Sequence, residues 1–396
     1  MKLSPARYLS NSCLAALLLL LPIFKASGQL RINEIVALNS SLAFDTDFGE
    51  FSDYIELYNA SSVPVNLRGY SITDKPGNPS KWNFPDITLQ PSQYLLIWAD
   101  GRNKVPGDTA FCIYRNTTIN VSEIHTNFSL SGDGEYVGIF DSDKNLIDEV
   151  YFGVQQHDVS YGRTPDNPNQ WSYFADPTPG ETNSPYNASS PVFSGNPIFS
   201  IDGGFFATTQ QITLSSPNSN AVIRYTLDGT DPTFSSPVAG EPITVFRNYT
   251  LKARVYETGK LPGKVIVQTY FIGESIDMPV VSITTNSDHL YDFDFGLFRN
   301  SIKEREVPAS IQYFDEHGKP QFAENAGIRI FGSTIYNLPQ KPVSVRFRGK
   351  FGAANINYPL FNDRENQSFK SFNLRNGGND HNLAFFRDGL MTRKAG

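Results

Sequence analysis

Asp141, Asp143 and Asn145 are acidic or amide residues at alternate positions, which is the spacing of the first ligands in an EF-hand calcium loop. The sixth position of such a loop requires glycine for a sharp turn, and the twelfth supplies a bidentate glutamate. This chain has Leu146 and Phe152 at those positions. We therefore interpret the segment as a turn between two strands and not as a calcium site.

Other residues with the right chemistry for a metal or a nucleophile do not form a recognisable pattern. Asp45 with Asp47 and Asp292 with Asp294 are acidic pairs, which we interpret as parts of solvated loops because nothing nearby fixes a ligand set. The five histidines lack the spacing typical of zinc ligands. No Gly-x-Ser-x-Gly motif of a serine hydrolase occurs. We expect no metal site and no catalytic residue.

Short β-strands are the elements that must position these residues. Aromatic residues make up 13% of the 396 residues, which favours a β-rich fold. Alternating or apolar runs bounded by Asn, Gly, Asp and Pro predict strands. In the first half of the chain the predicted strands are 30–38, 53–58, 94–98, 136–140 and 146–152. Near the C-terminal end, a strand over 369–374 and a Gly/Asn turn precede the start of a helix.

The N-terminus has the features of a secretory signal peptide. Lys2 and Arg7 precede an apolar run from Leu14 to Phe24, which the small residues 26–28 follow. The run is too short to span a membrane comfortably. We expect residues 1–28 to be removed and the protein to be secreted or held at the cell surface, with no membrane span after cleavage. Of the two cysteines only Cys112 would remain, so no internal disulfide is expected.

Net charge excludes one class of partner. The formal net charge is -7 and the pI is about 5.3. A protein that binds nucleic acid needs a basic stripe, and none is seen in the sequence. We expect no nucleic-acid partner.

Residues 29–183 resemble the lamin tail domain. The resemblance rests on INEI at 32–35, DYIELYN from Asp53, LRGYSITD from Leu67, NFSLSGDGEYVGIFD from Asn127 and TPGETN ending at Asn183. It implies an immunoglobulin-like β-sandwich that serves as a binding or spacing module and carries no catalysis.

A second module follows a segment rich in Ser, Pro, Asn and Gly at 184–196, which has linker composition. Within residues 197–273, IRYTLDGTDPT from Ile223 resembles the C-terminal domain of chitobiases and β-hexosaminidases. This resemblance implies a small fibronectin-III-like β-sandwich, an accessory domain without the glycosidase barrel.

Residues 278–396 resemble the beginning of the CotH (spore coat protein H) kinase domain. MPVVSITTN from Met278, GIRIFGSTIYNLPQKPVSVRF from Gly327 and FNLRNGGNDHNLAFFRDGL from Phe372 carry the likeness in order. It implies an incomplete α+β lobe of a kinase-like fold, which would use ATP and Mg²⁺ only if the domain were complete, so we expect no cofactor in this chain. Lys341 and Arg346 stand where the family has cations, so both are candidate phosphate contacts, although charged strand residues facing water are the alternative interpretation. The family's catalytic aspartates are expected beyond residue 396.

The fold class predicted is therefore mainly β: an immunoglobulin-like sandwich, a smaller fibronectin-III-like sandwich and a partial α+β lobe. We expect an exported, multimodular protein whose β-sandwich modules serve binding, adhesion or spacing. Its partner would be an unknown protein or a surface glycan, and we expect no complete active site. The alternative is the front part of a CotH-type protein kinase. The partial lobe is expected to be the first part lost in limited proteolysis.

Overall fold

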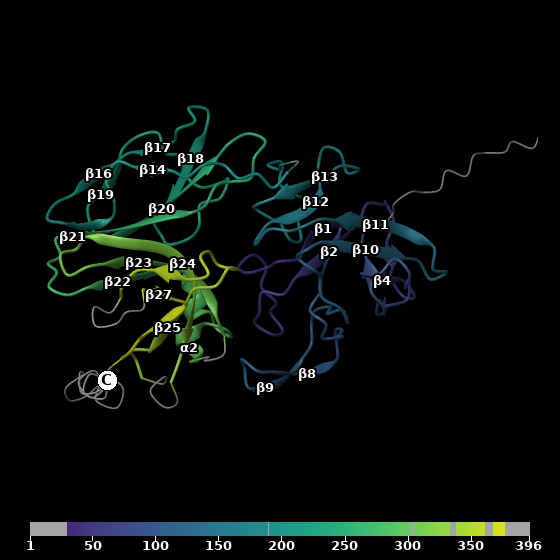
Figure 1. Cartoon of the computed structure of the whole chain (residues 1–396). Coiled ribbons are helices and arrows are strands. Elements are labelled where there is room, and N and C mark those ends of the chain that lie inside the picture. The colour runs from purple at the N-terminus through teal and green to yellow at the C-terminus, as the bar shows by residue number, and fades with distance from the viewer. Residues whose placement is uncertain (1–29, 189, 302–304, 333–337, 361–366, 377–396) are drawn as a thin grey trace, which may run out of the picture.

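The computed structural model describes residues 30–188, 190–301, 305–332, 338–360 and 367–376 (Figure 1). Over these residues the chain is nearly all β, and its only helices are the short α1 (Ser287–Tyr291) and α2 (Leu297–Asn300). The predicted mainly β fold class is confirmed. The expected signal peptide and the helix expected near the C-terminal end lie outside the described residues. None of the helices in the described part is long and apolar enough to cross a membrane.

The first unit is a sandwich of a five-stranded and a four-stranded sheet. The larger sheet has the order β13-β12-β1-β2-β7 and the smaller one β11-β10-β4-β5. Their strands are β1 (Leu30–Val36), β2 (Tyr54–Asn59), β4 (Ser71–Thr73), β5 (Trp82–Asn83), β7 (Tyr94–Trp98), β10 (Glu135–Phe140), β11 (Leu146–Phe152), β12 (Ser160–Arg163) and β13 (Trp171–Phe174). Apolar residues of both sheets, such as Ile55 and Val137, form one core between them.

Two pairs of short antiparallel strands complete this unit. They are β3 (Val65–Asn66) with β6 (Thr88–Leu89), and β8 (Thr109–Cys112) with β9 (Thr117–Asn120). The second pair is a hairpin that extends from the sandwich towards the rest of the chain (Figure 1).

The segment that imitates a calcium loop is a hairpin turn, as predicted. It joins the antiparallel strands β10 and β11. The Asp141 carboxylate accepts hydrogen bonds from the backbone N–H groups of Asp143 at 2.9 Å and Asn145 at 2.8 Å. Side-chain capping of this kind is why Asp and Asn favour turns.

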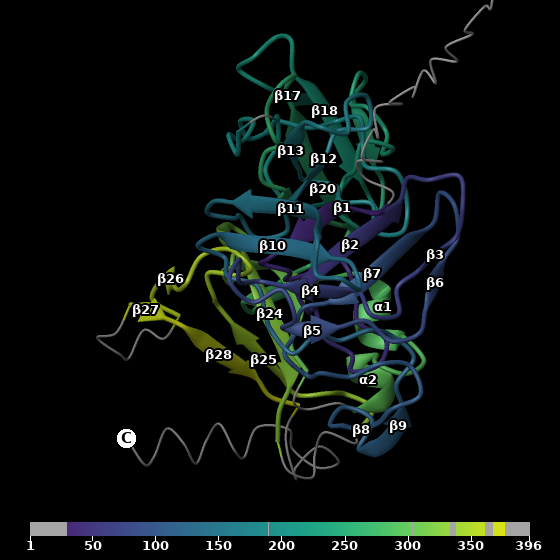
Figure 2. The same ribbon diagram turned by 90° about the vertical axis from the view of Figure 1, so that its right-hand side faces the viewer.

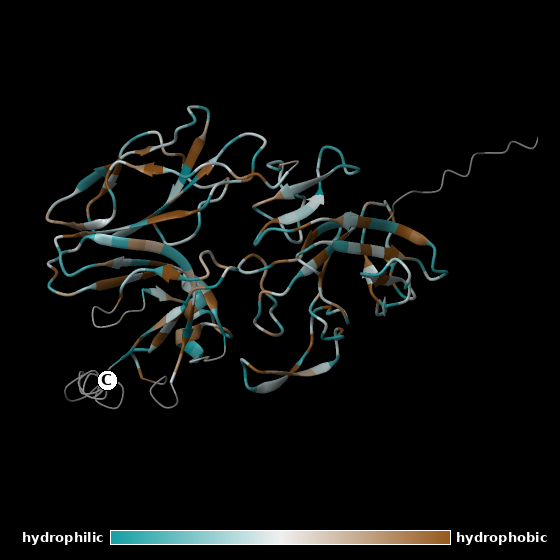
Figure 3. Cartoon of the chain, in the orientation of Figure 1, coloured by the Kyte–Doolittle hydropathy of each residue, from teal (hydrophilic) through white to brown (hydrophobic). Residues whose placement is uncertain are grey.

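The second unit is a smaller sandwich above the third unit in Figure 1. Its main sheet has the order β15-β21-β20-β18, and two pairs of short strands, β14 with β17 and β16 with β19, cover it. Its strands are β14 (Ile198–Phe199), β15 (Gly204–Phe206), β16 (Gln210–Ile212), β17 (Leu214–Ser215), β18 (Val222–Thr226), β19 (Ile243–Val245), β20 (Tyr249–Tyr256) and β21 (Ile266–Ile272). Figure 3 shows hydrophobic segments on strands such as β11 in the first unit and β18 in the second.

The third unit is a five-stranded antiparallel sheet of order β22-β23-β24-β25-β28, with α1 and α2 in the connection that follows β22. Its strands are β22 (Val280–Thr284), β23 (Val307–Phe314), β24 (Pro320–Ile330), β25 (Val343–Arg346), β28 (Ser371–Leu374) and the separate pair β26 (Ile356–Asn357) and β27 (Ser368–Phe369). The long pairing of β23 with β24 is the centre of this sheet.

The first and third units share one hydrophobic core. Phe48, Cys112 and Ile119 of the first unit belong to the same buried cluster as Phe295 and Val345 of the third. Figure 2 shows the β8–β9 hairpin beside α2, which agrees with this cluster. The second and third units are also in contact, because the backbone N–H of Thr269 donates to Gln312 Oε1 at 2.7 Å. The three units therefore pack as one body.

The segment at 184–196 is partly packed, although its composition is that of a linker. Ala188 is 1% exposed and Ser194 is 6% exposed. Backbone hydrogen bonds join Ala188 to Tyr173 of the first unit and Ser194 to Leu261 of the second. These contacts hold the segment between the two sandwiches.

Candidate functional site

A cavity of about 390 Å³ lies where the first unit meets the sheet of the third. The connection between β1 and β2 forms one wall, and strands β24 and β25 with their flanking residues form the other. The cavity is lined by Asn39, Gly49, Glu50, Phe51, Tyr114, Arg305, Glu306, Arg329, Arg346, Arg348 and Lys350. Because both walls are required, the cavity exists only in the packed arrangement of the two units.

The lining carries an excess of positive charge. Five of these residues are cations and two are carboxylates, which leaves a formal charge of +3. Glu306 is shared between Arg346, at 3.4 Å, and Arg348, at 3.0 Å. Glu50 forms a 2.7 Å ion pair with Arg102, which does not line the cavity. The two carboxylates therefore cannot neutralise all five cations.

Strand register explains how Glu306 reaches these cations. Gly327 of β24 lies opposite Arg346 of β25. A Cβ atom on Gly327 would lie 2.7 Å from Glu306 Oε1 and 2.5 Å from the Phe351 ring. Glycine at this position thus makes room for the Glu306 carboxylate over the sheet.

Burial and neighbouring positive charges lower the pKa values of cations that line the cavity. Burial lowers the pKa of Arg305 to about 10. The pKa of Arg346 is lowered by burial and then by the charges of Arg329 and Arg348. The Nε of Arg329 is buried and has no hydrogen-bond partner within the described ranges. A bound anion would oppose all three effects, since it would offset the like charges and accept from the unpaired donor.

The two sequence-predicted phosphate contacts occupy different places. Arg346 lines the cationic cavity, as just described. Lys341 lines a separate cavity with Tyr291, Phe298 and two other residues, and its Nζ donates to Ser301 Oγ at 2.9 Å. The structure therefore does not bring the two cations together around one ligand.

Sequence reasoning missed most of the cationic cavity. Arg305, Arg329, Arg348 and Lys350 were not predicted as site residues. The run from Arg346 to Lys350 contains three cations, and this was the one feature of the sequence that could have indicated an anion site. The residues that the first unit contributes to the cavity could not be predicted, because they lie far from the third unit in the sequence.

The interpretation of one acidic pair is wrong. Asp45 is 0% exposed and Asp47 is 4% exposed, so neither belongs to a solvated loop. In the other pair Asp294 is exposed, and the Asp292 carboxylate accepts from the backbone N–H groups of Asp294 and Phe295 as in an ordinary turn.

Comparisons with known families confirm two of the three resemblances. The profile of the Lamin Tail Domain family matches residues 24–153, and that of the Chitobiase/beta-hexosaminidase C-terminal domain matches residues 201–267. The chain thus contains a lamin tail domain, which is an immunoglobulin-like β-sandwich, and a chitobiase-type C-terminal domain. The kinase resemblance stays a prediction.

Comparisons with individual proteins add little. No curated protein matches the sequence. Among solved structures, the sialic acid binding region of a Streptococcus sanguinis SK1 adhesin bound to 3'sLn is 10% identical and covers 87% of this chain and 96% of that chain. Its TM-score is 0.15, which is too low to indicate a shared fold.

Proposed function

We propose that this chain is an exported cell-surface binding protein whose cationic cavity holds the acidic group of a surface glycan. One observation carries the proposal: a cavity lined by five cations and two carboxylates, with the buried Nε of Arg329 unpaired. The lamin tail and chitobiase-type sandwiches act as the rigid frame that keeps this cavity in shape and away from the cell.

The chemistry of the lining suits a carboxylate or a phosphate ester. The planar fork of an arginine donates two parallel hydrogen bonds to such groups. Tyr114 adds a hydroxyl group that can bind a hydroxyl of the ligand. The volume of about 390 Å³ lies within the range of small-molecule sites. An acidic sugar presents both the anion and the hydroxyls.

The alternative function is the front part of a CotH-type kinase that binds ATP and Mg²⁺. Arg346 in the cationic cavity is compatible with a phosphate contact. Lys341 lines another cavity, so within the cationic cavity this alternative is supported by Arg346 alone. We therefore rank glycan binding above phosphoryl transfer.

Calorimetric titration of the mature chain tests the proposal. The probes are 3'-sialyllactose, inorganic phosphate, and ATP with and without Mg²⁺. We expect sialyllactose to bind, and Arg329→Gln to weaken binding about tenfold or more, because a hydrogen bond to a charged group contributes roughly 1.5–3 kcal/mol. Arg247→Gln is the matched control, since Arg247 is exposed in the second unit and should leave the affinity unchanged.

The outcomes separate the two functions. Binding of ATP that requires Mg²⁺, without binding of sialyllactose, would favour the kinase. Binding of no anion at all would contradict an anion site in the cavity. Export is tested separately by sequencing the N-terminus of the secreted protein, which should begin near Gln29.

A further inference from the structure

A second cluster of polar side chains is buried inside the lamin tail domain. Asp45 and Asp47 come from the connection between β1 and β2, Asp100 follows β7, and Glu123 and His125 precede β10. The imidazole of His125 is 0% exposed. Three separate segments of the chain thus bring a histidine and four carboxylates together.

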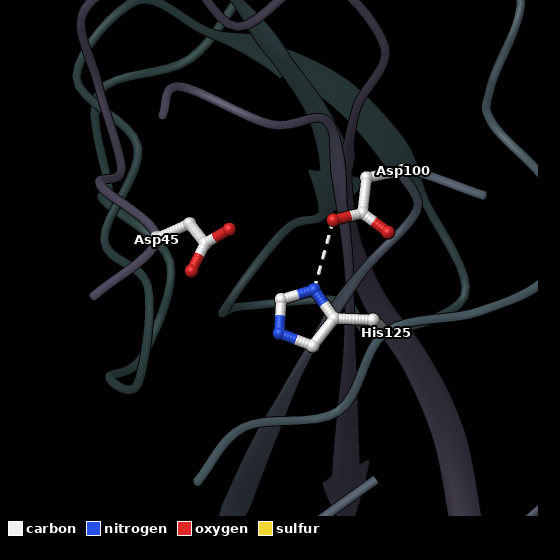
Figure 4. A group of neighbouring side chains, drawn as sticks. All are labelled: Asp45, Asp100 and His125. Carbon is white, nitrogen blue, oxygen red and sulfur yellow. Dashed lines mark hydrogen bonds and ion pairs between the residues drawn. The ribbon is translucent and has the colours of Figure 1, made fainter. Parts of the chain in front are cut away.

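The geometry of three of these residues suits a metal ion. His125 Nδ1 forms a 2.8 Å hydrogen bond with Asp100 Oδ2 (Figure 4). The same oxygen also accepts from Arg102 Nη1 at 2.5 Å. One ligand atom each from Asp45, Asp100 and His125 all lie within 4.8 Å of one another. Ligand atoms about 2.1 Å from one ion are about 3.4 Å apart in a tetrahedral site, and about 3 Å or 4.2 Å apart, for adjacent or opposite ligands, in an octahedral site. A small inward movement of the Asp45 carboxylate therefore completes three ligands around one ion.

An unpaired oxygen marks where the ion would bind. Asp45 is 0% exposed, and its Oδ2 has no hydrogen-bond partner among the described residues. Its Oδ1 accepts from the backbone N–H groups of Asp47 and Phe48. Figure 4 shows the Asp45 carboxylate directed towards the imidazole of His125. A buried carboxylate oxygen without a partner is unfavourable, and a cation at this point would compensate it.

The neighbouring carboxylates are already satisfied. Asp47 accepts hydrogen bonds from the backbone and hydroxyl of Ser122 and from the backbone of Glu123. Glu123 accepts from the indole Nε1 of Trp98 at 3.0 Å. These bonds orient the surroundings of the site, and Asp45 Oδ2 is the buried oxygen of this cluster without a partner among the described residues.

We propose that Asp45, Asp100 and His125 form a structural site for one divalent transition-metal ion, Zn²⁺ or Mn²⁺. The imidazole ligand favours such ions over Ca²⁺ and Mg²⁺, which prefer oxygen ligands alone. Because Asp45 and His125 are fully buried, the site is closed to a substrate. Its role is to hold the three segments of the chain together.

The ion would stabilise the turn over residues 45–50, through which the first unit contacts the third. The backbone of Asp45 is hydrogen-bonded to Glu50 and Gly49 across this turn. Gly49 O in turn accepts from Arg305 Nε at 3.1 Å. Metal binding at Asp45 therefore stabilises a turn on which the interface depends.

The test uses the mature chain without a polyhistidine tag, stripped of metal by a chelator and then titrated with ZnCl₂ or MnCl₂. We expect one ion per chain and slower amide hydrogen exchange over residues 45–50. Asp45→Asn should weaken binding at least about tenfold, since loss of an outer hydrogen-bond partner alone typically costs 10–100-fold. Asp166→Asn, an exposed acid in the same domain, should bind like the wild type.

Asp45→Asn is expected to fold without metal, because the substitution removes an uncompensated buried charge. Asp100→Asn is a second variant with the same expected loss of binding. Equal affinity of the wild type and both variants would overturn the site, since the ions would then bind elsewhere. A preference for Ca²⁺ over both Zn²⁺ and Mn²⁺ would overturn the assigned class of metal.

Discussion

Glu34 is a carboxylic acid buried in strand β1 of the lamin tail domain. It is 0% exposed, and its two oxygens accept hydrogen bonds from Ser160 Oγ at 2.6 Å and from the Tyr54 hydroxyl at 2.9 Å. Burial raises the pKa of Glu34 to about 7, and these two hydrogen bonds offset the effect only in part. The charged form is therefore unfavourable in the folded protein.

Glu34→Gln should stabilise the lamin tail domain at alkaline pH. Because the pKa is raised on folding, the native state holds more protons than the unfolded state between pH 4.5 and about 7, so stability falls as pH rises through this window. Above it, removing the charge should raise the free energy of unfolding by about 2–3 kcal/mol. Near pH 4 the variant and the wild type should be alike. Hydrogen exchange of the β1 and β2 amides at both pH values measures this difference.

A glutamine can replace Glu34 without an unpaired group, because Ser160 and Tyr54 each carry a hydroxyl that can donate or accept. Glu181→Gln is the control, since this carboxylate is exposed and should change stability little at either pH. A variant of Glu34 that is less stable than the wild type at pH 8 would show that the carboxylate is bound in its charged form.

Residue chemistry was predictable from the sequence where it depends on near neighbours. The turn at Asp141 follows from residues within a few positions of one another, and it was predicted correctly. Arg346, which the kinase resemblance marked as a phosphate contact, lines the cationic cavity, and its role as a phosphate contact stays a prediction. The cluster of Asp45, Asp100 and His125 was missed, because its members come from three distant segments.

At the scale of elements, periodicity was a reliable guide. The predicted strands 94–98 and 146–152 match β7 and β11 residue for residue. The run 94–98 is fully apolar, and the run 146–152 follows a turn rich in Asp and Asn that marks where the strand begins. Longer connections, such as the one between β1 and β2, were not predictable in the same way, since their conformation depends on what they pack against.

The connection between β1 and β2 contains a turn that requires glycine. Gly49 has a φ of +76°, and a Cβ atom there would lie 2.3 Å from the ring of Phe295. Gly49→Ala should destabilise the contact between the first and third units by about 2–4 kcal/mol, through both backbone strain and the steric clash. The shift in the thermal unfolding midpoint of the mature chain measures the loss.

Gly107→Ala separates the two causes. Gly107 has a φ of +95°, and nothing lies within 4 Å of its added Cβ. This variant should therefore show the backbone cost alone, about 1–2 kcal/mol. Equal midpoints for the two variants would mean that the Phe295 ring moves aside without cost.

At the scale of the whole molecule, the contact between the first and third units was not predictable. The sequence suggested separate modules, with the partial lobe as the part most easily removed. The structure instead buries Phe48, Cys112 and Ile119 in one core with Phe295 and Val345. Such a contact joins residues far apart in the chain, and neither periodicity nor motif order reports it.

The shared core leads to a different expectation for limited proteolysis. A protease that cuts within 278–376 should leave fragments that stay together on size-exclusion chromatography, because separation would expose this apolar surface. Phe295→Ala should release them, since loss of a buried phenylalanine side chain costs about 3–5 kcal/mol. Phe295 is 2% exposed and lies 5.2 Å from the Phe44 ring, centroid to centroid. Phe293→Ala is the control, because Phe293 is 72% exposed and should leave the nicked complex intact. Release of residues 278–376 from the nicked wild type would show instead that the third unit is held only by the chain.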